Sequence, residues 1–197
     1  MTPIGAVCVF CGSQPGTRPA YLQAARDLGA QLARRGWTAV YGGGHVGMMG
    51  ALADSTLAAG GRVIGVIPEH LMRPEVAHQG LSELLVVDSM HTRKRVMAGR
   101  SDAFVVLPGG YGTFEEMFEM VTWLQLQLHA KPVGLVNVDG YFDHLLAFLR
   151  HAAEQGFIRP QHRGLLAIEA TVDAILERLQ RQAAATLHAR RGDLQRS

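Results

Sequence analysis

The sequence predicts one α/β domain, a doubly wound parallel sheet with helices on both faces. Three observations carry this prediction. Short apolar runs alternate along the chain with amphipathic helical patterns, and these runs are continuously apolar, as in strands that are buried on both faces. The 197 residues also contain no linker, repeat or low-complexity stretch, and this length suits a single domain with a well-filled core.

The first predicted helix has the clearest pattern, because apolar residues recur at spacings of three and four from Leu22 to Leu32 before Gly36 ends it. Gly60 and Gly61 end the second helix, and a proline-punctuated loop is expected over 68–80. The strands are expected at residues 6–10, 38–41, 62–67, 84–87, 103–107 and 133–138. The helices are expected at residues 19–35, 48–59, 91–100, 113–128, 142–155 and 171–181.

The charge of the chain is small, and its positive excess lies at the C-terminal end. Residues 181–197 hold four arginines and one aspartate, so the rest of the chain is close to neutral within the total of +2. We therefore expect one domain over 1–180 and a basic, flexible tail over 181–197, with no nucleic-acid partner. No apolar run reaches the roughly 18 residues of a membrane span, and the N-terminus does not resemble a signal peptide. A cytoplasmic protein without membrane contact is expected.

The two cysteines, Cys8 and Cys11, form a C-x-x-C motif. They straddle the end of the first predicted strand rather than beginning a helix. This position favours two small buried side chains over a redox pair.

Glycine is in excess: average usage would give about 14, and the chain has 23. Ten of them fall in three turns, each of which follows a predicted strand. Ligands of doubly wound sheets bind beyond the carboxyl ends of the strands, so these turns are the expected site. The first turn, residues 11–16, adds the hydroxyl of Ser13 to its glycines.

The second turn carries G-x-G-x-x-G at Gly42, Gly44 and Gly47, between a strand and a helix. Free N–H groups at such a helix start favour an anion. A dinucleotide site also needs an acid about 20 residues further on, where this chain has Arg62. The turn therefore indicates phosphate binding rather than an NAD site.

The third turn runs from Pro108 through three glycines to Thr113 and is followed by Glu115 and Glu116. It predicts a second anion cradle with two carboxylates in the first helical turn. Because Thr113-x-x-Glu116 also fits a capping box, a purely structural interpretation of Glu116 remains open. Before this turn, Arg93 and Lys94 begin a helix at the end of a strand, where they form either a solvated face or a substrate contact.

Four motifs stand in this chain in a characteristic order: Cys-Gly-Ser at 11–13, Y-G-G-G-x-x-G-M-M-G at 41–50, M-H-x-R-K at 90–94 and P-G-G-Y-G-T-x-E-E at 108–116. Over roughly residues 5–180 the sequence thereby resembles the LOG (Lonely Guy) family of cytokinin riboside 5′-monophosphate phosphoribohydrolases. The resemblance implies a Rossmann-like fold and a homodimer with active sites at the subunit interface. It also implies hydrolysis of nucleoside 5′-monophosphates to free base and ribose 5-phosphate.

The family's catalytic pair falls on Arg93 and Glu116. Its substrate contacts fall on Glu75, Lys94, Gly110, Tyr111, Gly112, Thr113, Glu115 and Thr122. No cofactor and no metal are implied, and the nine histidines show no ligand spacing. Some relatives are labelled lysine decarboxylase, but pyridoxal phosphate chemistry needs a Schiff-base lysine. Neither Lys94 nor Lys131 has a suitable context.

These residues suggest a mechanism. Residues 110–113, helped by Ser13, Gly43 and Gly44, would hold the 5′-phosphate. Glu116 would stabilise the cationic sugar and orient water, and Arg93 would align Glu116 or the substrate. A non-catalytic nucleotide carrier is the alternative, and an NAD(P)-dependent enzyme is a third. The helix over 113–128 is apolar on most sides, which predicts burial in the core or in a dimer interface.

Overall fold

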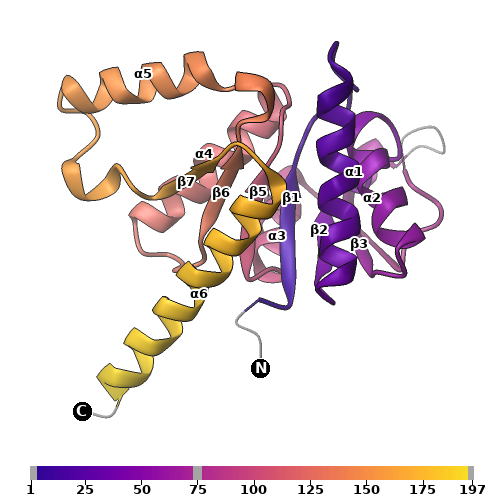
Figure 1. Ribbon diagram of the computed structural model, residues 1–197. Coiled ribbons are helices and arrows are strands. Elements are labelled where there is room, and N and C mark those ends of the chain that lie inside the picture. The colour runs from indigo at the N-terminus through magenta and orange to yellow at the C-terminus, as the bar shows by residue number, and fades with distance from the viewer. Residues whose placement is uncertain (1–3, 73–76, 195–197) are drawn as a thin grey trace.

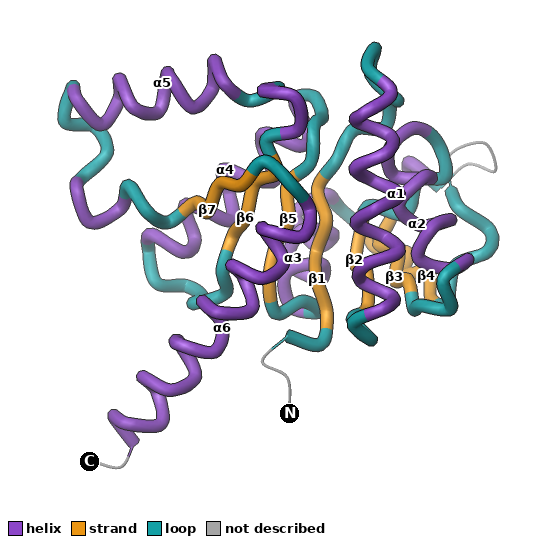
Figure 2. Tube along the Cα trace, in the orientation of Figure 1, coloured by secondary structure: helices purple, strands orange, loops and turns teal. Residues whose placement is uncertain are grey.

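The computed structural model describes residues 4–72 and 77–194 and confirms the predicted α/β class (Figures 1 and 2). In these residues seven parallel strands form one sheet in the order β4-β3-β2-β1-β5-β6-β7. The strands are β1 (Ala6–Phe10), β2 (Thr38–Tyr41), β3 (Val63–Pro68), β4 (Glu83–Val87), β5 (Ala103–Val106), β6 (Val133–Val136) and β7 (Leu166–Glu169).

Helices cover both faces of the sheet. The α-helices are α1 (Pro19–Arg34), α2 (Gly47–Ala58), α3 (Met90–Gly99), α4 (Tyr111–Gln125), α5 (Asp143–Glu154) and α6 (Val172–Leu194). Three short 3₁₀ turns lie at Glu69–Leu71, Val138–Gly140 and Pro160–His162. In Figure 1, α1 and α6 lie in front of the sheet and α3 and α4 lie behind it.

The continuously apolar strands build two cores at once, because successive side chains of a strand point to opposite faces. On β1, Val7 and Val9 pack with α1, α2 and α6, whereas Cys8 and Phe10 pack with α3 and α4. All four side chains are buried. A half-exposed sheet would instead require polar residues at alternate positions.

Most other predicted bounds are shifted by one or two residues, and three elements differ most from the prediction. β7 was not predicted, because it is a four-residue edge strand with one paired neighbour, and Ile168 in it is partly exposed. α4 begins at Tyr111, two residues early, because Gly110 is the extended N-cap residue. α6 continues to Leu194 rather than ending at residue 181, so the helix extends into the segment that was expected to be a flexible tail.

The order of the strands fixes where a ligand can bind. β1 lies between β2 and β5, so the chain leaves the sheet in opposite directions after β1 and after β5. This is the topological switch point, where doubly wound sheets open a crevice. The two diverging turns are joined by one hydrogen bond, in which the Gly12 N–H donates to the Pro108 carbonyl over 3.0 Å. No helix within the described residues is long and apolar enough to cross a membrane.

Candidate active site

A cleft of about 360 Å³ opens at the switch point and brings the three glycine turns together. Most of the predicted site lines this cleft, as the polar and glycine residues Gly12, Ser13, Gly42, Gly44, Arg93, Gly110, Tyr111, Gly112, Thr113, Glu115 and Glu116. Its apolar lining includes Val9, Met49, Ile67, Leu71 and Met90. Segments separated by about a hundred residues thus line one cleft.

Arg93 is held in the cleft by three elements. Its Nε donates to the carbonyl of Val66 in β3 over 3.1 Å. Its guanidinium lies directly over Gly42, where the Cβ of any other residue would collide with Nη2. Its Nη1 lies 3.1 Å from Oε1 of Glu116 on α4. The absence of a side chain at Gly42 is therefore what allows Arg93 to reach the carboxylate.

Glu116 is the most unusual group in the cleft, since only 7% of it is exposed. Its Oε1 is within ion-pair distance of Arg93 but accepts no hydrogen bond among the described residues. Burial raises the pKa of this carboxyl to about 7, against the opposing effect of Arg93. A carboxyl that titrates near neutrality can both give and take a proton, which suits general acid–base chemistry.

The Glu116 side chain does not cap a helix. The N-cap of α4 is Gly110, which contributes no side-chain bond, and Thr113 lies inside the first helical turn. The capping-box interpretation of Glu116 is therefore wrong. The first N–H groups of α4 also lack a capping side chain, and the residues that carry them line the cleft. Such a helix start favours a bound anion.

Lys94 is turned to α4 rather than into the cleft. Its ammonium pairs with Glu115 and lies 3.0 Å from Oε2 of Glu119, one helical turn further along. Burial disfavours the charged amine, but the interactions of the ammonium with the carboxylates of Glu115 and Glu119 prevail and raise the pKa of Lys94. The partnership with Glu119 was not predicted, because a contact between two helices leaves no spacing signal in one sequence.

Three further predicted residues lie outside the cleft wall. Gly43 has a positive φ of 78°, faces Ile67 and Leu84, and accepts a hydrogen bond from the N–H of His78. Thr122 is exposed on α4, nearly two turns beyond Glu116. Glu75 belongs to residues 73–76 and lies outside the described residues.

The two cysteines are free and buried. Burial raises the pKa of both thiols, and the nearby carboxylate of Glu116 adds to the effect. Neither thiol is a ready nucleophile, because the reactive form is the thiolate. Within the described ranges, no group of three or more His, Cys, Asp and Glu side chains could hold a metal ion.

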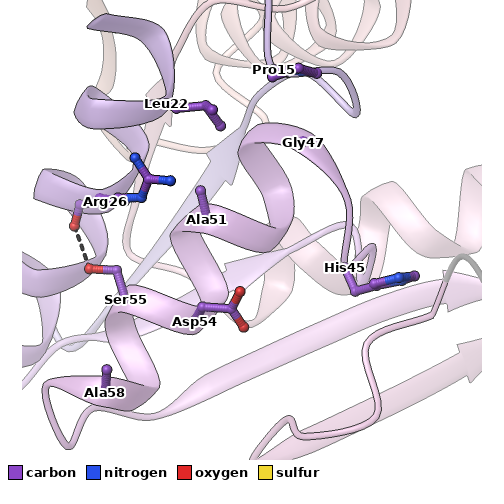
Figure 3. Close-up of a pocket in the computed structure, with 9 residues that line it drawn as sticks. All are labelled: Pro15, Leu22, Arg26, His45, Gly47, Ala51, Asp54, Ser55 and Ala58. Atoms are coloured by element: carbon purple, nitrogen blue, oxygen red, sulfur yellow. Dashed lines mark hydrogen bonds between the residues drawn. The ribbon is translucent and has the colours of Figure 1, made fainter. Parts of the chain in front are cut away.

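A second, more open groove of about 580 Å³ runs between α1 and α2 (Figure 3). Arg26 lies over the apolar side chains of Leu22 and Ala51 there, and Ser55 donates to the Arg26 carbonyl over 2.6 Å. The carboxylate of Asp54 lies 2.9 Å from Nε2 of His78. Gly47 of the second glycine turn lines this groove, but none of the candidate catalytic or substrate-binding residues that the structure describes does.

The fold and the cleft define a Rossmann-like α/β protein whose candidate active site combines an uncapped helix start with a buried carboxyl. A family model described as "Possible lysine decarboxylase" matches residues 49–179. The rice protein LOGL9, a probable cytokinin riboside 5′-monophosphate phosphoribohydrolase, is 52% identical over 174 residues, which cover 88% of this chain and 77% of the rice protein. Arabidopsis LOG5, a cytokinin riboside 5′-monophosphate phosphoribohydrolase, is 45% identical and matches 88% of this chain and 76% of its own length. The chain belongs to the LOG family.

Solved structures of similar fold are more distant in sequence. The molybdenum cofactor carrier protein of Chlamydomonas reinhardtii matches 91% of this chain and 98% of its own, with a TM-score of 0.68 and 24% identity. The molybdenum cofactor binding protein of Rippkaea orientalis matches 87% and 93%, with a TM-score of 0.67 and 22% identity. At this identity the likeness concerns the fold.

The raised pKa of Glu116 predicts a loss of stability with rising pH. Between the usual value of 4.5 and about 7, the folded state binds a proton that the unfolded state has released. The free energy of unfolding should therefore fall across this window, by on the order of 2–4 kcal/mol. Glu116→Gln should lack this slope. Urea unfolding of both proteins from pH 4 to pH 8 measures it, and parallel profiles would contradict the assignment.

Proposed function

We propose that this protein hydrolyses the N-glycosidic bond of purine and cytokinin nucleoside 5′-monophosphates, such as AMP or isopentenyladenosine monophosphate. The products are the free base and ribose 5-phosphate. The observation that carries the proposal is the position of Glu116, a buried carboxyl with a pKa near 7 that lies in one cleft with the uncapped start of α4. The names of the plant relatives support the same reaction.

The start of α4 is the proposed phosphate site. Residues 110–113 line the cleft and present the free N–H groups of a helix N-terminus, which stabilise a dianionic phosphate. Ser13 and Gly44 line the same cleft and complete the cradle. Gly43 contributes from outside the lining, since its positive φ of 78° shapes the turn that carries Gly44.

The carboxyl of Glu116 is proposed to act at the sugar. When the bond between C1′ and the base nitrogen breaks, its electron pair leaves with the base and positive charge develops at C1′. The ionised carboxylate stabilises this charge, takes a proton from the attacking water and directs the oxygen to C1′. Arg93 keeps the carboxylate aimed at the cleft. The departing base takes up one proton from solvent and becomes neutral, and Glu116 returns the proton of the attacking water to solvent, so that the sum is addition of one water molecule.

Lysine chemistry is not part of the proposal. Lys94 is engaged by Glu115 and Glu119, and we assign it to holding Glu115 at the edge of the cleft. Lys131 donates to the Ala98 carbonyl over 2.7 Å and immediately precedes β6, at the opposite end of the sheet from the cleft. Neither amine is placed to form a Schiff base in the cleft.

We also propose a cytoplasmic homodimer with its active sites at the subunit interface. The apolar side chain of Phe118 on α4 is exposed, and so is that of Leu126, the residue that directly follows α4. The same helix supplies Glu116 to the cleft. Thr122 lies between Phe118 and Leu126 on the same face, since residues four apart stack on a helix. A partner that covers this stripe would place Thr122 in the subunit interface.

The activity assay is direct. Incubation with AMP and with isopentenyladenosine monophosphate, followed by chromatography, should show free base. Glu116→Gln and Arg93→Ala should each lower kcat at least about 100-fold, because both remove stabilisation at the reacting sugar. Glu154→Gln and Arg150→Ala, at exposed sites on α5, are the matched controls. Nucleotide binding without release of base would favour the carrier alternative.

The oligomer has its own test. Sedimentation should show a dimer for the wild-type protein, and Leu126→Glu should shift it to monomer with loss of activity, because a buried charge costs interface stability. Phe157→Glu is the control, since Phe157 is even more exposed but lies after α5, outside the α4 stripe. A wild-type protein that sediments only as a monomer would rule out the shared site.

A further inference from the structure

The turn before α4 has its three carbonyl groups fixed by three different parts of the chain. The Pro108 carbonyl accepts from the N–H of Gly12, and the Gly110 carbonyl accepts from the N–H of Phe114 in the first helical bond, each over 3.0 Å. Between them, the Gly109 carbonyl accepts from the hydroxyl of Tyr141 over 2.5 Å. Of these three donors, only Tyr141 donates from its side chain. Tyr141 is neither a predicted site residue nor one of the residues that line the cleft.

The peptide that Tyr141 holds joins two glycines, Gly109 and Gly110. Two residues without Cβ atoms allow a peptide unit to rotate more freely than other pairs do. The peptide unit is planar and trans, so its C=O and N–H point in opposite directions. A Gly109 carbonyl fixed toward Tyr141 therefore sends the N–H of Gly110 the other way, toward the cleft that Gly110 lines.

The phenol ring is itself held firmly. It packs edge-on against Tyr21 of α1, with centroids 5.4 Å apart, and against Phe142, with centroids 4.8 Å apart. The segment before it is tied to the chain ahead of α1, because Arg18 donates to the Asp139 carbonyl over 3.2 Å. Asp139 and Gly140 both have positive φ, and this tight turn directs the chain at Tyr141 back toward Gly109.

We propose that Tyr141 is a positioning residue of the phosphate site, which orients the Gly109–Gly110 peptide so that the N–H of Gly110 meets the substrate's phosphate. This inference rests on the proposed phosphate site at the start of α4. Without the hydroxyl, the peptide gains a second orientation that places a carbonyl oxygen toward the anion. Phosphate binding then weakens while the groups that act at the sugar, Arg93 and Glu116, stay in place.

Tyr141→Phe tests this, since it removes one oxygen and keeps the ring. The control is Tyr21→Phe, because the hydroxyl of Tyr21 makes no hydrogen bond within the described part of the chain and its ring touches the same cluster. Titration calorimetry with ribose 5-phosphate should give a dissociation constant roughly 5- to 20-fold higher for Tyr141→Phe than for the wild type. The Tyr21→Phe control should bind ribose 5-phosphate as tightly as the wild type does. In the activity assay, the KM of Tyr141→Phe for AMP should rise, while its kcat stays within twofold of the wild-type value.

The outcomes separate this inference from the proposed function. A Tyr141→Phe protein that binds ribose 5-phosphate as tightly as the wild type overturns the role of Tyr141, even if its melting temperature falls. A second outcome is that the wild-type protein binds ribose 5-phosphate, that Tyr141→Phe weakens this binding, and that no base is released from AMP. This result would support the role of Tyr141 in phosphate binding and refute the hydrolase activity. If Tyr141→Phe does not fold, ¹⁵N spectra of the wild type decide: the Gly110 amide should shift strongly with ribose 5-phosphate, and an unmoved amide refutes the proposal.

Discussion

The ion pair between Arg93 and Glu116 is the contact on which the rest of the cleft depends. Through Arg93 it connects the end of β3, the glycine turn after β2 and the start of α3 to α4 on the other side of the switch point. Each connection needs a particular backbone feature: a free carbonyl at Val66, no side chain at Gly42, and a helix start near Arg93, where Ser89 caps α3. The glycine-rich sequence at 42–44 is therefore needed to make room for the side chain of Arg93, and not only to bind a ligand.

The electrostatics of this pair set the chemistry that the cleft can perform. Removal from water favours the neutral form of Glu116, and the guanidinium of Arg93 favours the ionised form. Burial prevails, and the pKa of Glu116 settles near 7, where both forms are populated in a neutral solution. The carboxylate of Glu115 next to it pairs with Lys94, so the two adjacent acids have different cationic partners. A substrate phosphate at the start of α4 would add negative charge and raise the pKa of Glu116 further.

The sequence predicts the periodic parts of this structure well and the contacts between elements poorly. β1 and β2 have the predicted bounds, because continuous apolar runs are bounded by glycine and by polar turns. β7 was not predicted because Leu166–Glu169 is short, lies at an edge of the sheet and mixes buried and exposed positions. The cleft residues were predicted because they sit in motifs, whereas Glu119 and Tyr141 act across large sequence separations that no local spacing reveals. Thr122 lies outside the four motifs and was expected in the site only from the family resemblance, and it does not line the cleft of its own chain.

The central claim is that a nucleotide binds at the switch point with its phosphate on α4 and its glycosidic bond beside the side chain of Glu116. A crystal structure of the Glu116→Gln variant with intact AMP tests this most directly, since the variant keeps the shape of the side chain and should leave the substrate uncleaved. Phosphate oxygens should lie within hydrogen-bonding distance of the N–H groups of residues 110–113, and C1′ should face the substituted side-chain amide. AMP bound instead in the groove between α1 and α2, or with its phosphate away from α4, would refute this binding mode.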